Sequence, residues 1–422
     1  MIPPHADAET SFPPPFPSPP PSPPPFPPPF PPPFPLYEEE FAADPHSAYA
    51  RMRADHGPLV PVELAPGVPA TLVIGYAEAL HILRDEYRFP ADPRVWQRTV
   101  PDSCPVKPMM EWRPNAIRSQ GAEHTRYRAA NTAAIDAVDE HKLHDLVERI
   151  SHRAIAGFRP AGQADLLVDF AWPLTFQVLS DLLGCPDSIG HRIADGMNKL
   201  FDGGEIAIRG NVILNQAVAD LVAVKRNRPG YDITSRLIAH SARLDDTEMS
   251  HQIVTLYGAG IEPVVNLITN TLVRLLTDVE FSGDVHAGDA SVREALDFVL
   301  YRDPPLANFC FAYPPHPVNL GGYLLPAHQP VVISMAGCNN DPALGDPQNA
   351  SGNRAHLAWS AGPHACPARS QAYLIAESAI TYLLDALPEM ELACAPQDLT
   401  WRPGPFHRAI AHLPVVFPRV DQ

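Results

Sequence analysis

The sequence lacks any continuous run of about 20 apolar residues, the length that a helix needs to cross a bilayer. Its N-terminus has no basic stretch followed by an apolar one, so the signal-peptide pattern is missing as well. Positive charge is in the minority, because 31 Lys and Arg stand against 48 Asp and Glu and give a net charge of −17. These absences argue against a membrane protein and against a surface that binds nucleic-acid phosphates. They predict a soluble, cytoplasmic protein.

Cysteine is scarce and scattered. The six cysteines form no Cys-x-x-Cys pair, which fits neither a disulfide framework nor a zinc site. We expect five of them to be inert core or surface residues, with Cys366 as the exception. The six are Cys104, Cys185, Cys310, Cys338, Cys366 and Cys394.

Proline, in contrast, is abundant at the N-terminus, where it supplies 19 of the first 36 residues and the unit PPPF recurs. Proline fixes φ and removes the amide donor, so this tract predicts an extended polyproline II rod with no core of its own. Two interpretations remain open: a passive spacer, or a ligand for an aromatic-lined groove on a partner. We therefore predict a proline-rich tail over residues 1–36 and a folded domain over residues 37–422.

Helical patterns dominate the rest of the chain. A start signal at Asp44-Pro45-His46-Ser47 and a stop at Gly57 predict one helix, and the region 122–200 is almost entirely helical in pattern. Apolar residues at three- and four-residue spacing predict a long helix from about Asp246 to Val279. Residues 70–74 and the segment after Pro304 are strand-like. The pattern predicts a single large, mostly α domain with a small β part.

The segment from Trp359 to Cys366, WSAGPHAC, surrounds one cysteine with small residues. Small residues allow a flat cofactor to approach the backbone, and amides directed at sulfur stabilise a thiolate. On the residues alone, a buried free cysteine is the alternative. The segment resembles the haem-thiolate signature of the cytochromes P450, aromatic-Gly-x-Gly-x-His-x-Cys-x-Gly, with Ser360 and Ala368 in place of two glycines. The resemblance implies haem b (iron protoporphyrin IX), with Cys366 as its iron ligand and no other sulfur within reach. It also implies haem contacts from Trp359, Gly362 and His364.

Two further segments are similar to the same family. In GAEHTRYR (residues 121–128) the four-residue spacing places His124 and Arg128 on one helix face, which alone is compatible with a solvated surface. The resemblance implies that both contact the haem propionates. The segment GAGIEPVVN (residues 258–266) resembles the family's oxygen-side helix, which implies that Ala259, Gly260 and Glu262 line an oxygen pocket. The resemblance covers residues 37–422 and implies the P450 fold.

The chain departs from the family pattern at the oxygen-handling threonine of this helix, where it has Pro263. A proline inside a helix costs about 3 kcal/mol and removes the donor for the carbonyl of Ala259, so we expect the helix to break there. The hydroxyl that relays protons is lost. Glu262 remains as an acidic neighbour, either to organise water or as a purely structural residue.

Two other family features are missing. Where the family has Glu-x-x-Arg, this chain has Phe298 and Tyr301, so we expect packed apolar groups in place of the ion pair that holds this helix to the cysteine loop. An arginine that reaches a propionate is also absent from residues 312–315, which leaves that contact to His124, Arg128 and His364.

The resemblance implies a monooxygenase that inserts one atom of O2 into a hydrophobic small molecule, with electrons from a ferredoxin and its reductase. Two alternatives stay open. The first is a peroxide-using or non-oxygenating haem protein. The second is an interaction component in which the haem is structural and the proline tail is a docking arm.

Overall fold

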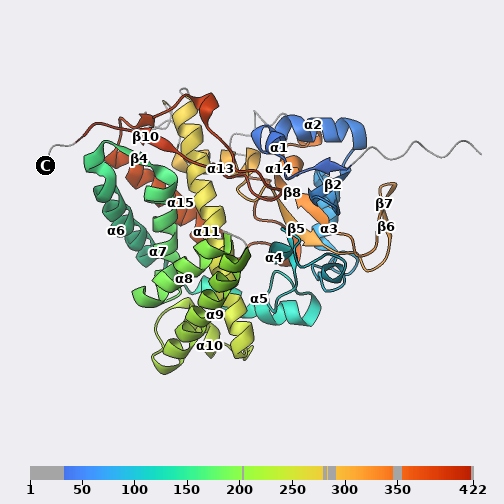
Figure 1. The fold of residues 1–422 in the computed structure, drawn as a ribbon, viewed down its shortest axis with the longest axis horizontal. Coiled ribbons are helices and arrows are strands. Elements are labelled where there is room, and N and C mark those ends of the chain that lie inside the picture. Colours follow the sequence, from blue (N-terminus) through green and yellow to red (C-terminus); the bar gives the residue numbers. More distant parts are fainter. Residues whose placement is uncertain (1–32, 202–203, 279–282, 284–290, 346–353, 420–422) are drawn as a thin grey trace, which may run out of the picture. The chain divides into compact units, whose positions relative to one another are not determined.

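A computed structural model of the protein describes residues 33–201, 204–278, 283, 291–345 and 354–419 (Figure 1). The longer helices are α2 (Pro45–His56), α3 (Tyr76–Arg84), α5 (Gly121–Asp136), α6 (Glu140–Phe158), α7 (Trp172–Leu182), α8 (Asp187–Phe201), α9 (Gly204–Asn227), α11 (Asp246–Thr277), α13 (Val292–Arg302) and α15 (Arg369–Ala386). Shorter ones are α1 (Glu39–Ala43), α4 (Lys107–Met110), α10 (Ile233–Ala239) and α14 (Met335–Asn339). The predicted mostly helical fold with a small β part is confirmed.

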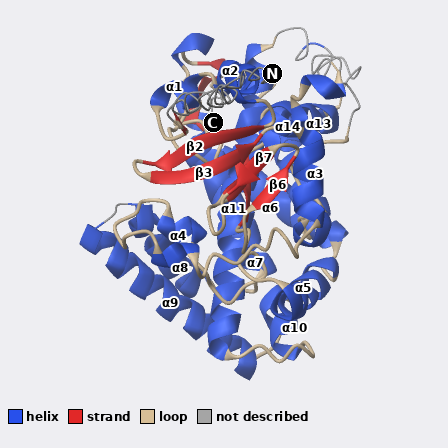
Figure 2. Ribbon diagram, turned by 90° about the vertical axis from the view of Figure 1, so that its right-hand side faces the viewer, coloured by secondary structure: helices blue, strands red, loops and turns tan. Residues whose placement is uncertain are grey.

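The described residues also form three sheets. The five-stranded sheet has the order β1 (Phe34–Pro35), β2 (Leu59–Ala65), β3 (Val68–Val73), β8 (Val331–Ser334), β5 (Asn308–Ala312), and Figure 2 shows β2 and β3 side by side. The smaller sheets are β4 (Gln163–Asp165), β10 (Pro414–Val416), β9 (Glu391–Leu392) and the hairpin β6 (Val318–Leu320), β7 (Tyr323–Leu325). β8 is buried along its whole length and pairs parallel with β3, so it brings distant parts of the sequence together.

The predicted helix after Asp44 is confirmed as α2. The Asp44 carboxylate accepts the amide of Ser47 at 3.0 Å, Pro45 occupies the first turn, and Gly57 follows the helix with φ of 75°. These are the N-cap, N1 and C-terminal glycine positions of a regular helix. Among the described helices, none is both long and apolar enough to span a bilayer.

The predicted boundary between tail and domain is wrong by a few residues. Phe34 and Pro35 form β1, which pairs parallel with β2, and the amide of Leu36 donates to the carbonyl of Glu63 at 2.9 Å. Leu36 is 0% exposed. An extended proline-rich segment needs little change to serve as an edge strand, where a missing amide is tolerated. The rest of the predicted tail, residues 1–32, lies outside the described residues.

We expect Leu36→Ala to lower the free energy of unfolding by about 2–4 kcal/mol, because it leaves a cavity in the core beneath the sheet. Thermal melting followed by circular dichroism measures the change. Phe30→Ala, inside the proline tract that the sequence predicts to lack a core, is the matched control and is expected to melt with the wild type. Equal melting of the Leu36 variant and the wild type would show that the folded domain begins after this residue.

α11 lies at the centre of the helical part and packs against α7, α9, α13 and α15 (Figure 1). It begins with a capping box, in which the Asp245 carboxylate accepts the Glu248 amide and the Glu248 carboxylate accepts the Asp245 amide. The long predicted helix is confirmed, but the predicted break at Pro263 is wrong, since α11 runs through this residue without interruption. Pro263 is flanked by buried Ile261 and Val264, and tertiary packing of this kind outweighs the local cost of one missing hydrogen bond.

Candidate active site

A largely apolar cavity lies between α5, α11, β5 and the segment that precedes α15. The side chains that bring chemistry to its wall are Glu86, Arg118, Arg128, Cys310, Ser360, His364 and Cys366. Apolar residues such as Leu83, Leu179, Val264 and Leu267 form much of the remainder. Of the residues that the sequence indicated, Ala259, Gly260, Pro263, Arg128, Trp359, His364 and Cys366 line this cavity.

Cys366 stands at the cavity wall just before α15. Its amide donates to the carbonyl of Trp359 at 2.8 Å, which closes the loop back on itself. Burial raises the pKa of the Cys366 thiol, whereas the backbone amide of Ala368 and the positive charges of Arg128 and Arg369 act to lower it. The loop therefore offers a half-buried sulfur with donors and cations arranged to stabilise a thiolate once a metal replaces the proton.

The loop before Cys366 approaches its surroundings closely. A Cβ at Gly362 would lie 2.1 Å from the carbonyl oxygen of Leu83, and Gly362 has φ of 68°, so only glycine fits here. Ser360 also adopts a left-handed conformation, with φ of 59°. Trp359 packs its ring against Tyr373 at 5.3 Å, and its indole nitrogen is buried without a hydrogen-bond partner.

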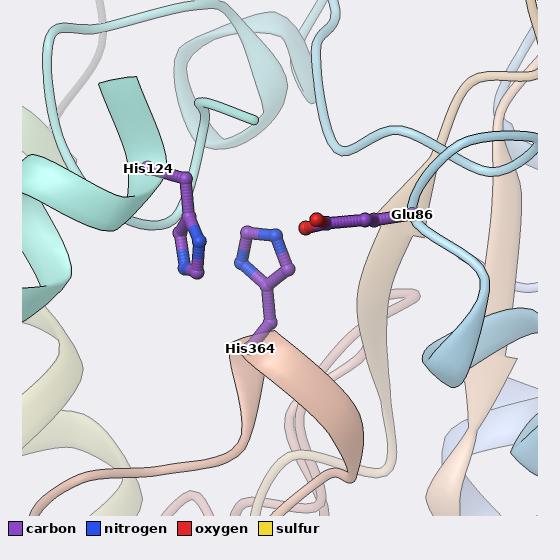
Figure 3. A group of neighbouring side chains, drawn as sticks. All are labelled: Glu86, His124 and His364. Atoms are coloured by element: carbon purple, nitrogen blue, oxygen red, sulfur yellow. The ribbon is translucent and has the colours of Figure 1, made fainter. Parts of the chain in front are cut away.

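His124 and His364 lie against each other although they are far apart in the sequence. Figure 3 shows the two imidazoles side by side, with the carboxylate of Glu86 beyond His364, and the ring centroids are 4.1 Å apart. In the described part of the chain, neither buried Nε2 atom has a hydrogen-bond partner. Burial lowers the pKa of both, to about 3 for His364, so each imidazole is neutral at pH 7.

Ligand atoms of Glu86, His124 and His364 lie within 4.8 Å of one another and have the geometry to hold a metal ion. Two of the three residues line the same cavity as Cys366, so this cluster belongs to the same site. Glu86 was missed in the sequence, because it lies in a loop after α3 with no motif around it.

Arg128 is placed by α5 one turn after His124, as the four-residue spacing predicts. Its guanidinium donates to the carbonyl of Ala365, next to Cys366. The two residues thus share one helix face, but that face is turned into the protein and not toward solvent.

α11 contributes Ala259, Gly260 and Pro263 to the cavity wall. A Cβ at Gly260 would lie 2.7 Å from Cδ1 of Leu179, so the glycine permits close packing with α7. Glu262 is not among the residues that line the cavity. The expectation that it lines an oxygen pocket with its neighbours is therefore wrong for the geometry described.

The Glu262 carboxylate is instead tied to the C-terminal part of the chain. It accepts hydrogen bonds from Arg402 and, at 3.3 Å, from Asn266. Burial alone would raise the pKa of Glu262, but Arg402 and His407 outweigh it and hold the pKa below its usual value. Glu262 is a paired carboxylate that is one helical position away from the cavity wall.

Asp297 links α13 to the segment that leads to Cys366. Its buried carboxylate accepts Nε of Arg354 at 2.8 Å and the hydroxyl of Tyr373 at 2.6 Å. Phe298, which the sequence assigned to an aromatic pair with Tyr301, instead lies under the guanidinium of Arg274 at 4.2 Å. The expectation that no ion pair would hold this helix to the cysteine loop is wrong, because Asp297 and Arg354 form one at a different position.

Two residues of the cavity wall, Cys310 and Arg118, lie in no sequence motif that indicated a role in the site. Cys310 has φ of 56° and lines the same cavity as Cys366, so the wall holds a second thiol that the sequence did not indicate. Burial raises the pKa of the Cys310 thiol. Arg118 lies in the loop before α5, where the sequence shows only an isolated arginine.

No family model matches the chain. Over 391 residues it is 29% identical to the cytochrome P450 monooxygenase PikC of Streptomyces venezuelae, a match that covers 89% of this chain and 92% of that protein. It is 28% identical over 399 residues to the 6-deoxyerythronolide B hydroxylase of Saccharopolyspora erythraea, covering 90% and 98%. The solved structure of tirandamycin C-bound P450 monooxygenase TamI superposes with a TM-score of 0.80 at 27% identity, covering 92% and 100%.

The predicted P450 fold is thereby confirmed, and over about 90% of its length the chain is similar in sequence to bacterial cytochrome P450 monooxygenases. The similarity implies a haem cofactor. The residues present fit that group. The cavity has a half-buried thiol at its wall. Nε2 of His364, Nε2 of the adjacent His124 and the indole nitrogen of Trp359 are buried without hydrogen-bond partners among the described residues.

Proposed function

We propose that the protein is a haem-thiolate monooxygenase that hydroxylates a hydrophobic small molecule. The observation that carries the proposal is Cys366, a half-buried sulfur at the wall of an apolar cavity, with the amide of Ala368 and two arginines acting on it. In this proposal Cys366 is the iron ligand, and His124, Arg128, Trp359, Gly362 and His364 hold the haem.

The reaction consumes one O2, two electrons and two protons, places one oxygen atom in a C–H bond of the substrate and releases the other as water. When bound, the haem supplies the activation of O2. The chain supplies the rest. Cys366 provides the sulfur that binds the iron, and Arg128 and the histidines neutralise or hydrogen-bond the haem carboxylates. Ala259 and Gly260 leave room beside the cofactor. The apolar walls exclude water from the reacting centre.

The substrate class follows from the cavity and the relatives. Its walls are mainly aliphatic and aromatic, which favours a hydrophobic ligand. Relatives include a vitamin D(3) 25-hydroxylase of Pseudonocardia autotrophica, 26% identical over 393 residues, and the 6-deoxyerythronolide B hydroxylase. We assign electron supply to a ferredoxin and its reductase, and keep the cytoplasmic location as a prediction.

In this proposal the chain is a divergent member of its family. Asp297 and Arg354 take the place of the Glu-x-x-Arg pair, and Pro263 takes the place of the oxygen-side threonine. Because the cavity wall of α11 then offers no hydroxyl near Pro263 among the described residues, peroxide-driven oxidation is the second candidate function. Peroxide already carries both electrons and both protons, so it does not depend on their delivery.

Turnover of one hydrophobic substrate separates the two candidates. Substrates are first chosen by the shift that they cause in the haem Soret band. Hydroxylated product formed with O2, ferredoxin, reductase and NADPH at a rate above that with hydrogen peroxide supports the monooxygenase. Product with peroxide only would overturn that assignment in favour of the second candidate.

A further inference from the structure

Arg118 is a buried cation at the cavity wall that no motif indicated. It lies in the loop before α5, and its amide donates to the Asn115 side chain at 2.9 Å. Asn115 in turn donates to the Thr255 hydroxyl of α11 at 2.8 Å. The backbone of Arg118 is therefore fixed to the central helix, and the residue as a whole is 6% exposed.

Among the described residues, no carboxylate forms an ion pair with the guanidinium of Arg118. The guanidinium donates to the carbonyl of Met109. It lies over the rings of Phe309 and Phe311, 5.4 Å and 5.1 Å from their centroids. Two aromatic faces and one carbonyl do not compensate for the hydration free energy that a full positive charge loses on burial. The site as it stands therefore favours an incoming anion.

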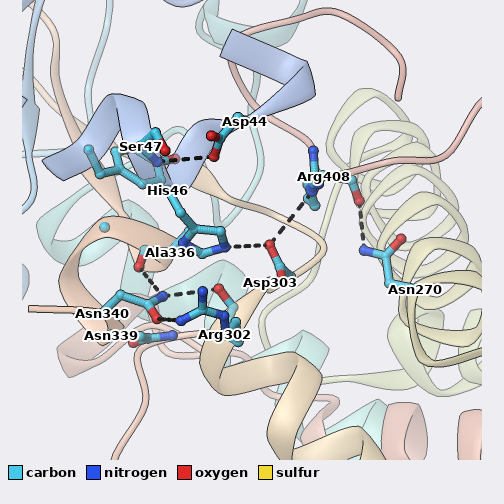
Figure 4. Close-up of polar contacts among 12 residues, drawn as sticks. Asp44, His46, Ser47, Asn270, Arg302, Asp303, Ala336, Asn339, Asn340 and Arg408 are labelled. Atoms are coloured by element: carbon cyan, nitrogen blue, oxygen red, sulfur yellow. Dashed lines mark hydrogen bonds and ion pairs between the residues drawn. The ribbon is translucent and has the colours of Figure 1, made fainter. Parts of the chain in front are cut away.

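Arg408 is a largely buried arginine with only a structural role, and its surroundings can be compared with those of Arg118. It also stacks on an aromatic ring, with its guanidinium 3.4 Å from the centroid of Trp401, and donates to a carbonyl, that of Ala42. Unlike Arg118 it faces a carboxylate, Asp303, at 3.6 Å, as Figure 4 shows. It does not line the cavity.

The position of Arg118 relative to β5 suggests which anion it meets. The guanidinium lies over Phe309 and Phe311, which belong to β5, and Ala312 is the last residue of that strand. The family resemblance places a propionate arginine in residues 312–315, where this chain has none. Arg118 thus brings a guanidinium against the strand that leads into this segment.

We propose that Arg118 binds a haem propionate and takes the place of the arginine missing from residues 312–315. This inference rests on the proposed function. The anion is a carboxylate in either case, and a carboxylate on the substrate is the alternative to the haem propionate. A propionate fits better, because Arg118 lines the same cavity as Arg128, His364 and Cys366, which the proposed function assigns to the haem.

The test uses the full-length haem-loaded protein and three variants. Arg118→Gln keeps a donor for the Met109 carbonyl but removes the charge, Arg118→Lys keeps the charge, and Arg408→Ala removes the structural arginine. Haem loss is followed by transfer to an excess of a haem-scavenging protein, well below the melting temperature. The iron reduction potential is measured on the same samples.

We expect Arg118→Gln to lose haem about 10- to 100-fold faster than the wild type, the range typical of a hydrogen bond to a charged group. Its reduction potential should fall, because a positive charge near the haem favours the reduced state. Arg118→Lys should recover most of both effects. Arg408→Ala should lower the melting temperature yet lose haem within about threefold of the wild-type rate.

Two results would overturn the inference. Equal haem loss and potential in wild type and Arg118→Gln would make the residue structural. Unchanged haem loss combined with weaker Soret-shift binding of a long-chain fatty acid would assign the cation to a substrate carboxylate. A wild type that binds no haem would contradict the proposed function itself, so the two failures are distinguishable.

Discussion

Cys366→Ala is expected to abolish the red-shifted Soret band of the reduced, carbon monoxide-bound protein. That band reports a thiolate bound to haem iron, and alanine has no atom that can serve as a ligand. The expected effect is complete loss of the band together with a large loss of turnover. Difference spectra of dithionite-reduced protein with and without carbon monoxide measure it.

Cys310→Ala is the matched control, because Cys310 is the other described cysteine at the same cavity wall. It is expected to keep the red-shifted band and the wild-type haem content. A band that survives in Cys366→Ala but disappears in Cys310→Ala would exchange the roles of the two cysteines. A band that survives in both single variants would show that either sulfur can reach the iron.

The helical framework could be predicted because its signals are local. A capping residue, an apolar spacing and a terminal glycine are each encoded within a few positions, and they placed α2 and α11 correctly. The break at Pro263 was predicted wrongly for the same reason, since a local rule does not include the buried side chains packed on either side. The tail boundary was misplaced because pairing of Phe34 with Val62 is not visible in a run of prolines.

Residues of the site were likewise recognised where their sequence signal is local and missed where it is not. Trp359, Gly362, His364 and Cys366 lie on one short loop, so one motif carries them together. Contacts between distant segments leave no such pattern: the ion pair of Asp297 and Arg354 spans 57 positions. Arg118 and Cys310 reach the cavity only through the folding of loops and of β5. What sequence reasoning missed are single residues whose partners lie elsewhere in the chain.

Glu262 illustrates the difference between a matching position and a matching geometry. Its place in the segment 258–266 suggested an acid beside the oxygen pocket, yet its carboxylate is paired with Arg402 and lies off the cavity wall. One helical position changes the direction of a side chain by about 100°, so a neighbour of a wall residue can face away from the wall. Because Glu262 is paired with Arg402, the described part of the cavity wall that α11 forms near Pro263 has no side chain that donates a proton.

Pro263→Thr is expected to increase coupling, the fraction of consumed NADPH that ends in hydroxylated product and not in hydrogen peroxide. Near this residue the described wall of α11 is formed by Ala259, Gly260, Pro263 and Val264, none of which carries a proton donor. A positioned acid–base group is commonly worth about 10²- to 10⁴-fold in rate. We therefore expect the wild type to release mostly hydrogen peroxide with a substrate that has no hydroxyl, and the variant to gain about tenfold in coupling.

The threonine changes two things at once, because it restores a backbone amide as well as adding a hydroxyl. Pro263→Ala is the matched control, since it restores the amide donor for the Ala259 carbonyl without the hydroxyl. A gain in Pro263→Thr that is absent in Pro263→Ala assigns the effect to the hydroxyl, whereas an equal gain in both assigns it to the helix backbone. Tight coupling of the wild type with a hydroxyl-free substrate, and no gain in either variant, would show that protons arrive by another route. The Arg402-paired Glu262, connected by ordered water, would then be the group to test next.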